Sequence, residues 1–173
     1  MEITIPTEKL ILGPVELSDL QNMYEIRTNS QVAKYINRDI NKSLEDIRQF
    51  IETVRKNDFY FTIKTKECNK FIGTITLWNI DWSKKYAEIG YELLPRFQGK
   101  GLMSEAVKGI LDYAFNEAGF QHIEAYTHHE NIASRKLLEG IGFKLITDKV
   151  DSDNLDNLIY GINNTAHKTT SDH

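Results

Sequence analysis

The sequence PRFQGKGLMS, residues 95–104, lies between an extended apolar stretch and a long amphipathic one. The preceding stretch, residues 86–94, is rich in aromatic and β-branched residues and ends at Pro95, which cannot donate to a strand ladder. The following stretch places apolar residues at helical spacing, namely Ala106, Val107, Ile110, Leu111 and Ala114. Gly119 then supplies a typical helix end. The segment therefore predicts a strand, a glycine-containing loop and a long helix.

Glycines in such a loop let backbone N–H groups approach a bound anion, and the helix N-terminus adds partial positive charge. Both properties favour a phosphate or pyrophosphate, although a tight loop that binds nothing would also use glycine. The loop lacks the G-x-x-x-x-G-K-[ST] pattern. It also lacks the full G-x-G-x-x-G pattern, because Met103 and Ser104 follow Gly101. The sequence thus calls for a phosphate site of another kind.

Outside this segment the two hydrophobic periodicities alternate. Strands are expected at residues 10–12, 59–64, 71–80, 122–127, 143–147 and 157–162, and helices at 18–27, 31–35, 43–54 and 131–142. Capping patterns begin two of the helices, at Ser18 and at Ser43. The turn at residues 67–69 predicts an antiparallel hairpin, whereas the strand–helix–strand unit predicts a parallel crossover. The sequence therefore predicts an α+β fold, with one mixed sheet of about seven strands and helices on both faces.

The bulk properties are those of an ordinary single domain of 173 residues, 40% hydrophobic and 27% charged, with a formal charge of -4. We expect residues 1–163 to form this domain and residues 164–173 to form a polar tail. The slight acidity argues against a nucleic-acid binder and tolerates a cationic substrate. A single cysteine, Cys68, excludes an internal disulfide. With no apolar membrane-length run and no signal peptide, a cytoplasmic location is expected.

Several blocks of the chain resemble the GNAT superfamily of N-acetyltransferases. The cofactor signature of that family is Gln or Arg, two residues, Gly, one residue, then Gly or Ala, and Gln98, Gly101 and Met103 occupy its positions. The string QGKGLMSEA is similar to the branch that acetylates ribosomal-protein N-termini (the RimJ/RimL-like acetyltransferases), where Met is ordinary at this place. Residues 131–143 resemble the element N-x-x-[SA]-x-x-L-[YL]-E-x-x-G-F, and residues 87–91 resemble the strand before the loop. The resemblance extends from about residue 7 to residue 162.

The resemblance implies a single-domain GNAT fold with a splayed parallel pair of strands, 86–94 and 122–127, and acetyl-CoA as co-substrate without a metal. The pyrophosphate of CoA is then expected on backbone N–H groups of the loop, at Gln98, Gly99, Lys100, Gly101, Leu102, Met103 and Ser104. The pantetheine arm is expected between the splayed strands. The acetyl carbonyl is expected near the N–H of Leu93, beside Leu94, where a fixed donor would also stabilise an oxyanion. The Asn131 amide is expected to bind pantetheine, to cap the helix that follows it, or both.

Glu88 is the predicted general base, because amine attack on a thioester needs a neutral amine. It alternates with Ala87 and Ile89, so it lies on the polar side of its strand, and it matches the Glu of the family's A-E-I element. The alternative is a solvent-facing strand residue. Glu92 lies on the same side of the strand and is the reserve candidate.

Ser134 is the predicted general acid for the departing CoA thiolate. Many GNAT enzymes use a tyrosine at the position that Leu138 fills here. Asn131, Ser134 and Leu138 share one helix face by their spacing, which makes Ser134 the nearest replacement. The alternative is that Ser134 only lets the helix approach CoA and that water supplies the proton.

The sequence leaves several classes of acceptor amine open. The RimJ/RimL-like resemblance implies a protein N-terminal α-amine, acetylated by direct attack in a ternary complex. The alternative acceptors are a polyamine and an amine antibiotic. The alternative to an enzyme is a non-catalytic module that binds acetyl-CoA. The chain could be a monomer or a homodimer. We interpret residues 128–130 (HHE) as a polar turn, because no second ligand cluster stands at zinc-like spacing. Of Trp78 and Trp82, one is expected in the core and one along the acceptor groove.

Overall fold

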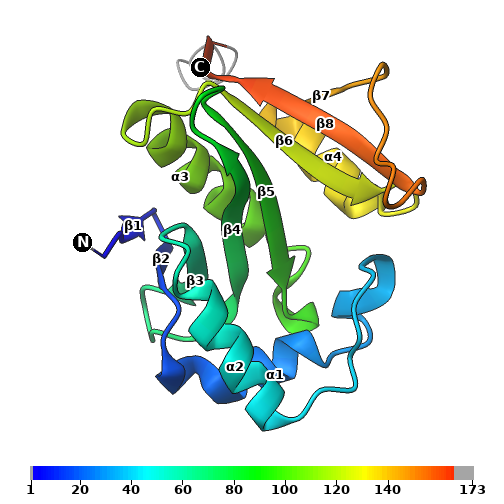
Figure 1. Ribbon diagram of the computed structural model, residues 1–173. Coiled ribbons are helices and arrows are strands. Elements are labelled where there is room, and N and C mark those ends of the chain that lie inside the picture. The colour runs from blue at the N-terminus through cyan, green and yellow to red at the C-terminus, as the bar shows by residue number, and fades with distance from the viewer. Residues whose placement is uncertain (1, 166–173) are drawn as a thin grey trace. The chain divides into compact units, whose positions relative to one another are not determined.

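The computed structural model describes residues 2–165, so most of the predicted tail, from residue 166 on, lies outside the described residues. Over these described residues the strands form an eight-stranded sheet in the order β1-β2-β3-β4-β5-β6-β8-β7 (Figure 1). This mixed sheet confirms the predicted α+β class and has one strand more than the seven expected. The chain divides into two compact units. The first unit consists of Met1–Thr76 and Tyr91–Gly109, and the second consists of Leu77–Gly90 and Ile110–His173. Within the described part, no helix has the length and apolarity needed to cross a bilayer.

The first unit contains an antiparallel series of strands. These are β1 (Ile5–Pro6), β2 (Leu10–Pro14), β3 (Tyr60–Thr65) and the beginning of β4 (Phe71–Asp81). Its helices include α1 (Leu20–Arg27) and α2 (Leu44–Val54), with short 3-10 helices at Leu17–Asp19, Val32–Tyr35 and Pro95–Phe97. The apolar core of this unit includes Ile47 and Ile51 of the predicted α2 stripe. The predicted hairpin of β3 and β4 is confirmed.

The two predicted helix caps have different outcomes. Ser43 caps α2, because its hydroxyl oxygen accepts from the Asp46 N–H at 3.1 Å while the Asp46 carboxylate accepts from the Ser43 N–H at 2.9 Å. The predicted start at Ser18 is wrong. There the Asp19 carboxylate turns back to the Glu16 N–H at 2.9 Å, so a 3-10 turn precedes α1. Asp19 is buried and also pairs with Lys64 at 2.8 Å, a tertiary contact that outweighs the local pattern.

The second unit contains β6 (His122–His128), β7 (Lys144–Leu145), β8 (Asn157–Asn163) and the beginning of β5 (Tyr86–Leu93). The strands β5 and β6 pair in parallel, as the crossover rule predicts, whereas β6, β8 and β7 pair antiparallel. Helix α4 (Ile132–Ile141) lies along β6 and β8 in Figure 1, where the Tyr160 hydroxyl of β8 donates to Glu139 at 2.9 Å. The helix ends at Gly142, whose φ of 118° is left-handed.

Helix α3 (Leu102–Asn116) connects β5 to β6. All five residues of its predicted apolar stripe are fully buried. The chain leaves the helix through Gly119 at φ 86°, a conformation in which glycine carries no steric cost. The strand–loop–helix–strand order inferred from residues 86–127 is therefore confirmed.

Candidate active site

The glycine loop has the backbone that an anion site requires. Gly99 and Gly101 have φ values of 75° and 77°, and α3 begins at the next residue, Leu102. A Cβ at either glycine would meet no atom within 4 Å, so the glycines serve the backbone conformation and leave open space above it. The first N–H groups of a helix have no hydrogen-bond partner within the helix. At the start of α3, the Glu105 N–H donates to the Gly101 carbonyl at 3.2 Å. The loop therefore presents backbone donors at the positive end of a helix.

Hydrogen bonds within the protein hold Leu93, the last residue of β5, and Leu94, which follows it. The Gln98 side-chain amide donates to the Leu93 carbonyl at 2.9 Å, which ties the loop to the end of β5. The Leu94 N–H donates to the Ile72 carbonyl at 2.9 Å, and the Leu94 carbonyl accepts from the Phe97 N–H at 2.9 Å. Of the predicted cofactor-binding positions, Leu94 thus has both backbone groups engaged and its side chain buried. Its neighbour Leu93 accepts at its carbonyl.

The parallel pairing of β5 with β6 stops early. It extends from Tyr86↔His122 to Ile89↔Ala125, although β5 continues to Leu93 and β6 to His128. The ladder of this parallel pair therefore ends before either strand does, and the splay of the two strands stays a prediction.

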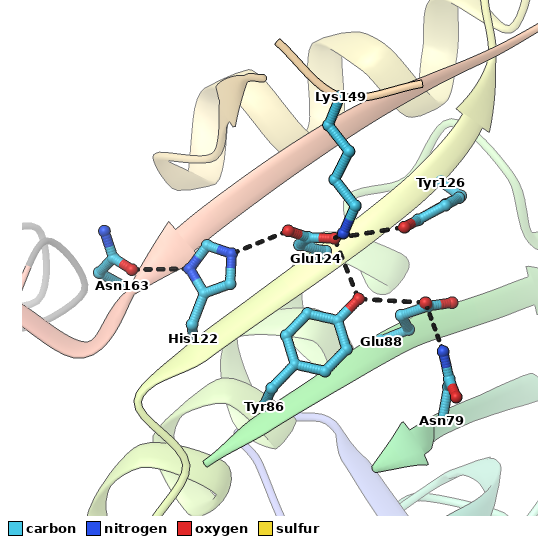
Figure 2. A network of polar contacts seen from close by, with 8 residues as sticks. All are labelled: Asn79, Tyr86, Glu88, His122, Glu124, Tyr126, Lys149 and Asn163. Atoms are coloured by element: carbon cyan, nitrogen blue, oxygen red, sulfur yellow. Dashed lines mark hydrogen bonds and ion pairs between the residues drawn. The ribbon is translucent and has the colours of Figure 1, made fainter. Parts of the chain in front are cut away.

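Glu88 does not face solvent. It is 5% exposed and lies in a network of polar side chains from β4, β5, β6 and the segment before β8 (Figure 2). The Asn79 amide donates to Glu88 Oε1 at 2.8 Å, and the Tyr86 hydroxyl lies 3.0 Å from the same oxygen. The same hydroxyl lies 3.0 Å from Oε2 of Glu124, the residue that the parallel register places opposite Glu88. One phenol therefore bridges two buried carboxylates.

Glu124 is the more strongly hydrogen-bonded of the two carboxylates. Its Oε2 accepts from Lys149 Nζ at 2.7 Å and from the Tyr126 hydroxyl at 3.3 Å, and its Oε1 lies 3.1 Å from His122 Nε2. Burial acts to raise the pKa of Glu124, but the hydrogen bonds from Lys149, His122 and Tyr86 hold it below its ordinary value. Burial and the hydrogen bond to Glu124 raise the pKa of Tyr86 well above its ordinary value. Tyr86 is consequently a neutral phenol, and Glu124 an ionised carboxylate, at neutral pH.

A cleft of about 640 Å³ opens onto this network. It is lined by the acidic Asp81, Glu88 and Glu124, the basic Lys84 and Lys149, the aromatic Trp82, Tyr86 and Tyr126, and Asn79 and Ile80. The cleft gives Glu88 access to a ligand of the size of an amine side chain or a peptide terminus.

The expectation that one tryptophan is buried is wrong. Trp78 is 50% exposed and Trp82 is 57% exposed. Trp82 lines the cleft and stacks on Phe120 with 4.9 Å between the ring centroids. Trp82 thus lines the cleft beside an aromatic neighbour while more than half of it stays exposed.

Glu92, the reserve base, is committed to a different cluster. Arg38 Nη1 lies 2.7 Å from Glu92 Oε2, and Arg27 Nη1 lies 4.0 Å from Glu92 Oε1. The Thr74 hydroxyl donates to the same carboxylate at 3.4 Å. Burial, followed by the charge of Glu92, raises the pKa of the neighbouring Tyr60 to about 12. A carboxylate between two guanidinium groups serves to balance their charge, which makes Glu92 less suited than Glu88 to accept a proton.

Glu92→Gln is expected to lower the free energy of unfolding by about 3 kcal/mol, because it leaves two largely buried guanidinium groups uncompensated. Urea unfolding followed by circular dichroism measures this change. The control is Asp39→Asn, which breaks an exposed ion pair with Lys42 at 3.6 Å. Its effect should stay below about 0.5 kcal/mol. Equal stability of Glu92→Gln and the wild type would contradict the charge-balancing role.

Asn131 and Ser134 lie at the start of α4. The Asn131 side-chain oxygen accepts from the Ser134 N–H at 3.2 Å, which confirms Asn131 as the helix cap. Both residues are partly exposed, whereas Leu138 on the same predicted face is fully buried. Leu138 therefore packs in the core, and Ser134 is the hydroxyl that the start of this helix offers.

The histidine pair stands in a hydrogen-bonded turn. His128, His129 and Asp156 bring possible ligand atoms within 4.8 Å of one another, and Asp156 was not foreseen from the sequence. However, His128 Nδ1 accepts from the Glu130 N–H at 3.1 Å, so a neutral His128 carries its proton on Nε2, the nitrogen that faces Asp156. Binding of a metal at Nε2 would need the proton on Nδ1, where the Glu130 N–H already donates, so the geometry favours the polar turn.

Sequence reasoning missed Tyr86, Glu124 and Lys149. Glu124 had a usable signal, since it lies between apolar Ile123 and Ala125 and the crossover predicts its strand beside that of Glu88. Lys149 had no such signal, because it comes from an irregular segment between β7 and β8.

The chain matches known proteins along most of its length. The family model of the acetyltransferase (GNAT) domain matches residues 9–144. An uncharacterized N-acetyltransferase, p20 of Bacillus licheniformis, is 34% identical over 148 residues, which cover 82% of each chain. The crystal structure of a GNAT-family acetyltransferase from Bacillus anthracis superposes with a TM-score of 0.84 at 26% identity, covering 94% of this chain and 99% of that one. Spermidine N-acetyltransferase from Vibrio cholerae, solved with CoA and spermine, superposes with a TM-score of 0.79 at 19% identity, covering 92% and 98%.

Proposed function

Because the chain belongs to the GNAT acetyltransferase family, we propose that it transfers the acetyl group of acetyl-CoA to a primary amine by direct attack in a ternary complex. It is an acyltransferase, and acetyl-CoA is the acetyl donor of its family. The observation that carries the proposal for this chain is the loop at residues 98–104, where two left-handed glycines open onto a helix N-terminus. We also infer a cytoplasmic location, supported by a single cysteine that has no disulfide partner in the chain.

The loop residues would hold the pyrophosphate of CoA through their backbone N–H groups. Two negative charges at that place gain from the partial charge of the α3 N-terminus. The Leu93 N–H would hold the acetyl carbonyl and stabilise the oxyanion that forms there. Since Asn131 already uses its side-chain oxygen as a cap, its amide NH₂ is the group left to donate to pantetheine. Bound acetyl-CoA supplies the activated acetyl group.

Glu88 would accept the proton of the attacking amine. It is buried beside the cleft, and its hydrogen bonds with Asn79 and Tyr86 both end on its Oε1 oxygen. Ser134 or water would protonate the thiolate that leaves.

The acceptor we favour is a protein N-terminal α-amine. The RimJ/RimL-like string QGKGLMSEA supports this choice, and so do the charges of the cleft. Three carboxylates line it, but Lys149 and Lys84 offset two of them through contacts of 2.7 Å and 3.7 Å. The cleft therefore suits an acceptor with one positive charge better than a polyamine with several. Spermidine is the second candidate, because Trp82 and two tyrosines in an acidic cleft also suit an alkylammonium chain.

Calorimetric titration with acetyl-CoA, with ATP and NAD as controls, tests the cofactor. Selective binding at micromolar strength is expected, and absence of binding would overturn the proposal.

CoA-thiol release with two acceptors then tests the acceptor. A short peptide with a free α-amine should have a kcat/KM at least about tenfold above that of spermidine, a difference of about 1.4 kcal/mol. The matched control is the same peptide with a blocked α-amine and a free internal lysine, which should not react. A preference for spermidine would assign the enzyme to small polyamine acceptors instead.

A further inference from the structure

The Tyr86 hydroxyl and its two carboxylate neighbours share one proton, although their two contacts could use two protons. The Tyr86 hydroxyl carries a single proton and lies 3.0 Å from each of two carboxylate oxygens, one on Glu88 and one on Glu124. It can donate to one of them at a time and must turn a lone pair towards the other. If Glu88 gains a proton, it can donate to the Tyr86 oxygen while Tyr86 donates to Glu124. Both contacts are then hydrogen bonds, and the chain of groups is complete.

The charges of Glu124 and Lys149 have opposite effects on the ionisation of Glu88. Glu124 is 5% exposed, as is Glu88, and two carboxylates joined through one phenol disfavour being ionised together. Lys149 counteracts this, because its ammonium lies 2.7 Å from Glu124 and 5.6 Å from the centre of the Tyr86 ring. The other titratable groups that line the cleft or touch the pair are Asp81, Lys84, His122 and Tyr126.

We propose that Glu124 and Lys149 are positioning residues that together set how readily Glu88 takes up the proton of the acceptor amine, with Tyr86 as the link between the carboxylates. The inference rests on the proposed role of Glu88 as base. In the step that it describes, an N–H bond of the acceptor ammonium breaks and an O–H bond forms on Glu88, which leaves a neutral amine to attack the thioester. Glu88 then passes a proton to the Tyr86 oxygen as the Tyr86 proton moves to Glu124.

The test measures the proton affinity of Glu88 directly and without substrate. In protein labelled with ¹³C at the glutamate carboxyls, the signal missing from Glu88→Gln identifies Glu88, and its chemical shift is followed against pH. Glu124→Gln removes a negative charge and should lower the titration midpoint of Glu88 by about one pH unit. Lys149→Met removes a positive charge and should raise it by about the same amount. The double variant should return the midpoint close to that of the wild type.

Lys84→Met is the matched control, because Lys84 lines the same cleft but its side chain is 80% exposed and pairs with Asp81. It should leave the midpoint nearly unchanged. Lys149 is 45% exposed, so its variant should fold even if Glu124→Gln does not, and its upward shift is a sufficient test. Midpoints that stay fixed, or that move in the same direction in both single variants, would overturn the inference. Retained turnover in Glu88→Gln would instead overturn the base assignment and leave the electrostatic coupling intact.

Discussion

Gly101→Glu is expected to lower the affinity for acetyl-CoA about 100-fold, equivalent to about 2.7 kcal/mol. The new carboxylate would stand at the α3 N-terminus, where the pyrophosphate is proposed to bind, and like charges repel there. The left-handed φ of 77° adds strain for any side chain. The fold should tolerate the change, because a Cβ at this position meets no atom within 4 Å. Calorimetric titration with acetyl-CoA measures the loss.

Two controls separate charge from strain. Gly101→Ala has the same backbone conformation without the carboxylate and should lose less than about tenfold in affinity. Gly119→Glu introduces the same carboxylate at another left-handed glycine, with φ 86° and open space, at the end of α3. It should bind acetyl-CoA as the wild type does. Unchanged affinity in Gly101→Glu would show that the pyrophosphate does not bind at this loop.

Long periodic segments were predicted best, because their burial pattern follows from local sequence. The α3 stripe and the parallel pairing of β5 with β6 needed only the helical period and the crossover rule. Short signals were less reliable. Ser18 and Ser43 have similar capping patterns, yet only Ser43 caps a helix. At Ser18 the next residue, Asp19, is drawn into a buried ion pair with Lys64 of β3, which no local pattern reveals.

For the candidate site, the sequence could nominate residues but not their partners. Strand alternation singled out Glu88 and Glu92 equally, and only the tertiary contacts distinguish them. Glu92 lies 2.7 Å from Arg38, whereas Glu88 lies beside the neutral groups Asn79 and Tyr86. Arg38 is located in an irregular segment before α2, and such segments give no periodic signal from which to predict a contact.

Glu88→Gln is expected to lower kcat about 1,000-fold at neutral pH, within the usual effect of a general base. The amide keeps an oxygen that can accept from Asn79 and Tyr86, so the local structure should persist while the proton acceptor is lost. Affinity for acetyl-CoA should be unchanged by titration, because Glu88 is not among the residues proposed to hold it. CoA-thiol release with the α-amine peptide measures kcat.

Two further measurements decide whether Glu88→Gln acts on the chemistry or on the structure. They are the pH dependence of its kcat and the activity of Glu92→Gln. An N-terminal amine loses its proton near pH 8, so the deficit of Glu88→Gln should shrink as the pH rises and free amine becomes available without a base. A purely structural defect would give the same deficit at every pH. Glu92→Gln, assayed under conditions in which it remains folded, should keep most of the wild-type kcat. The reason is that the Glu92 carboxylate of the wild type balances the charges of Arg27 and Arg38 and takes up no proton from the amine. If Glu92→Gln lost activity with this pH signature and Glu88→Gln did not, the proton would pass to Glu92, and the cluster of arginines would have to be understood as part of the acceptor site.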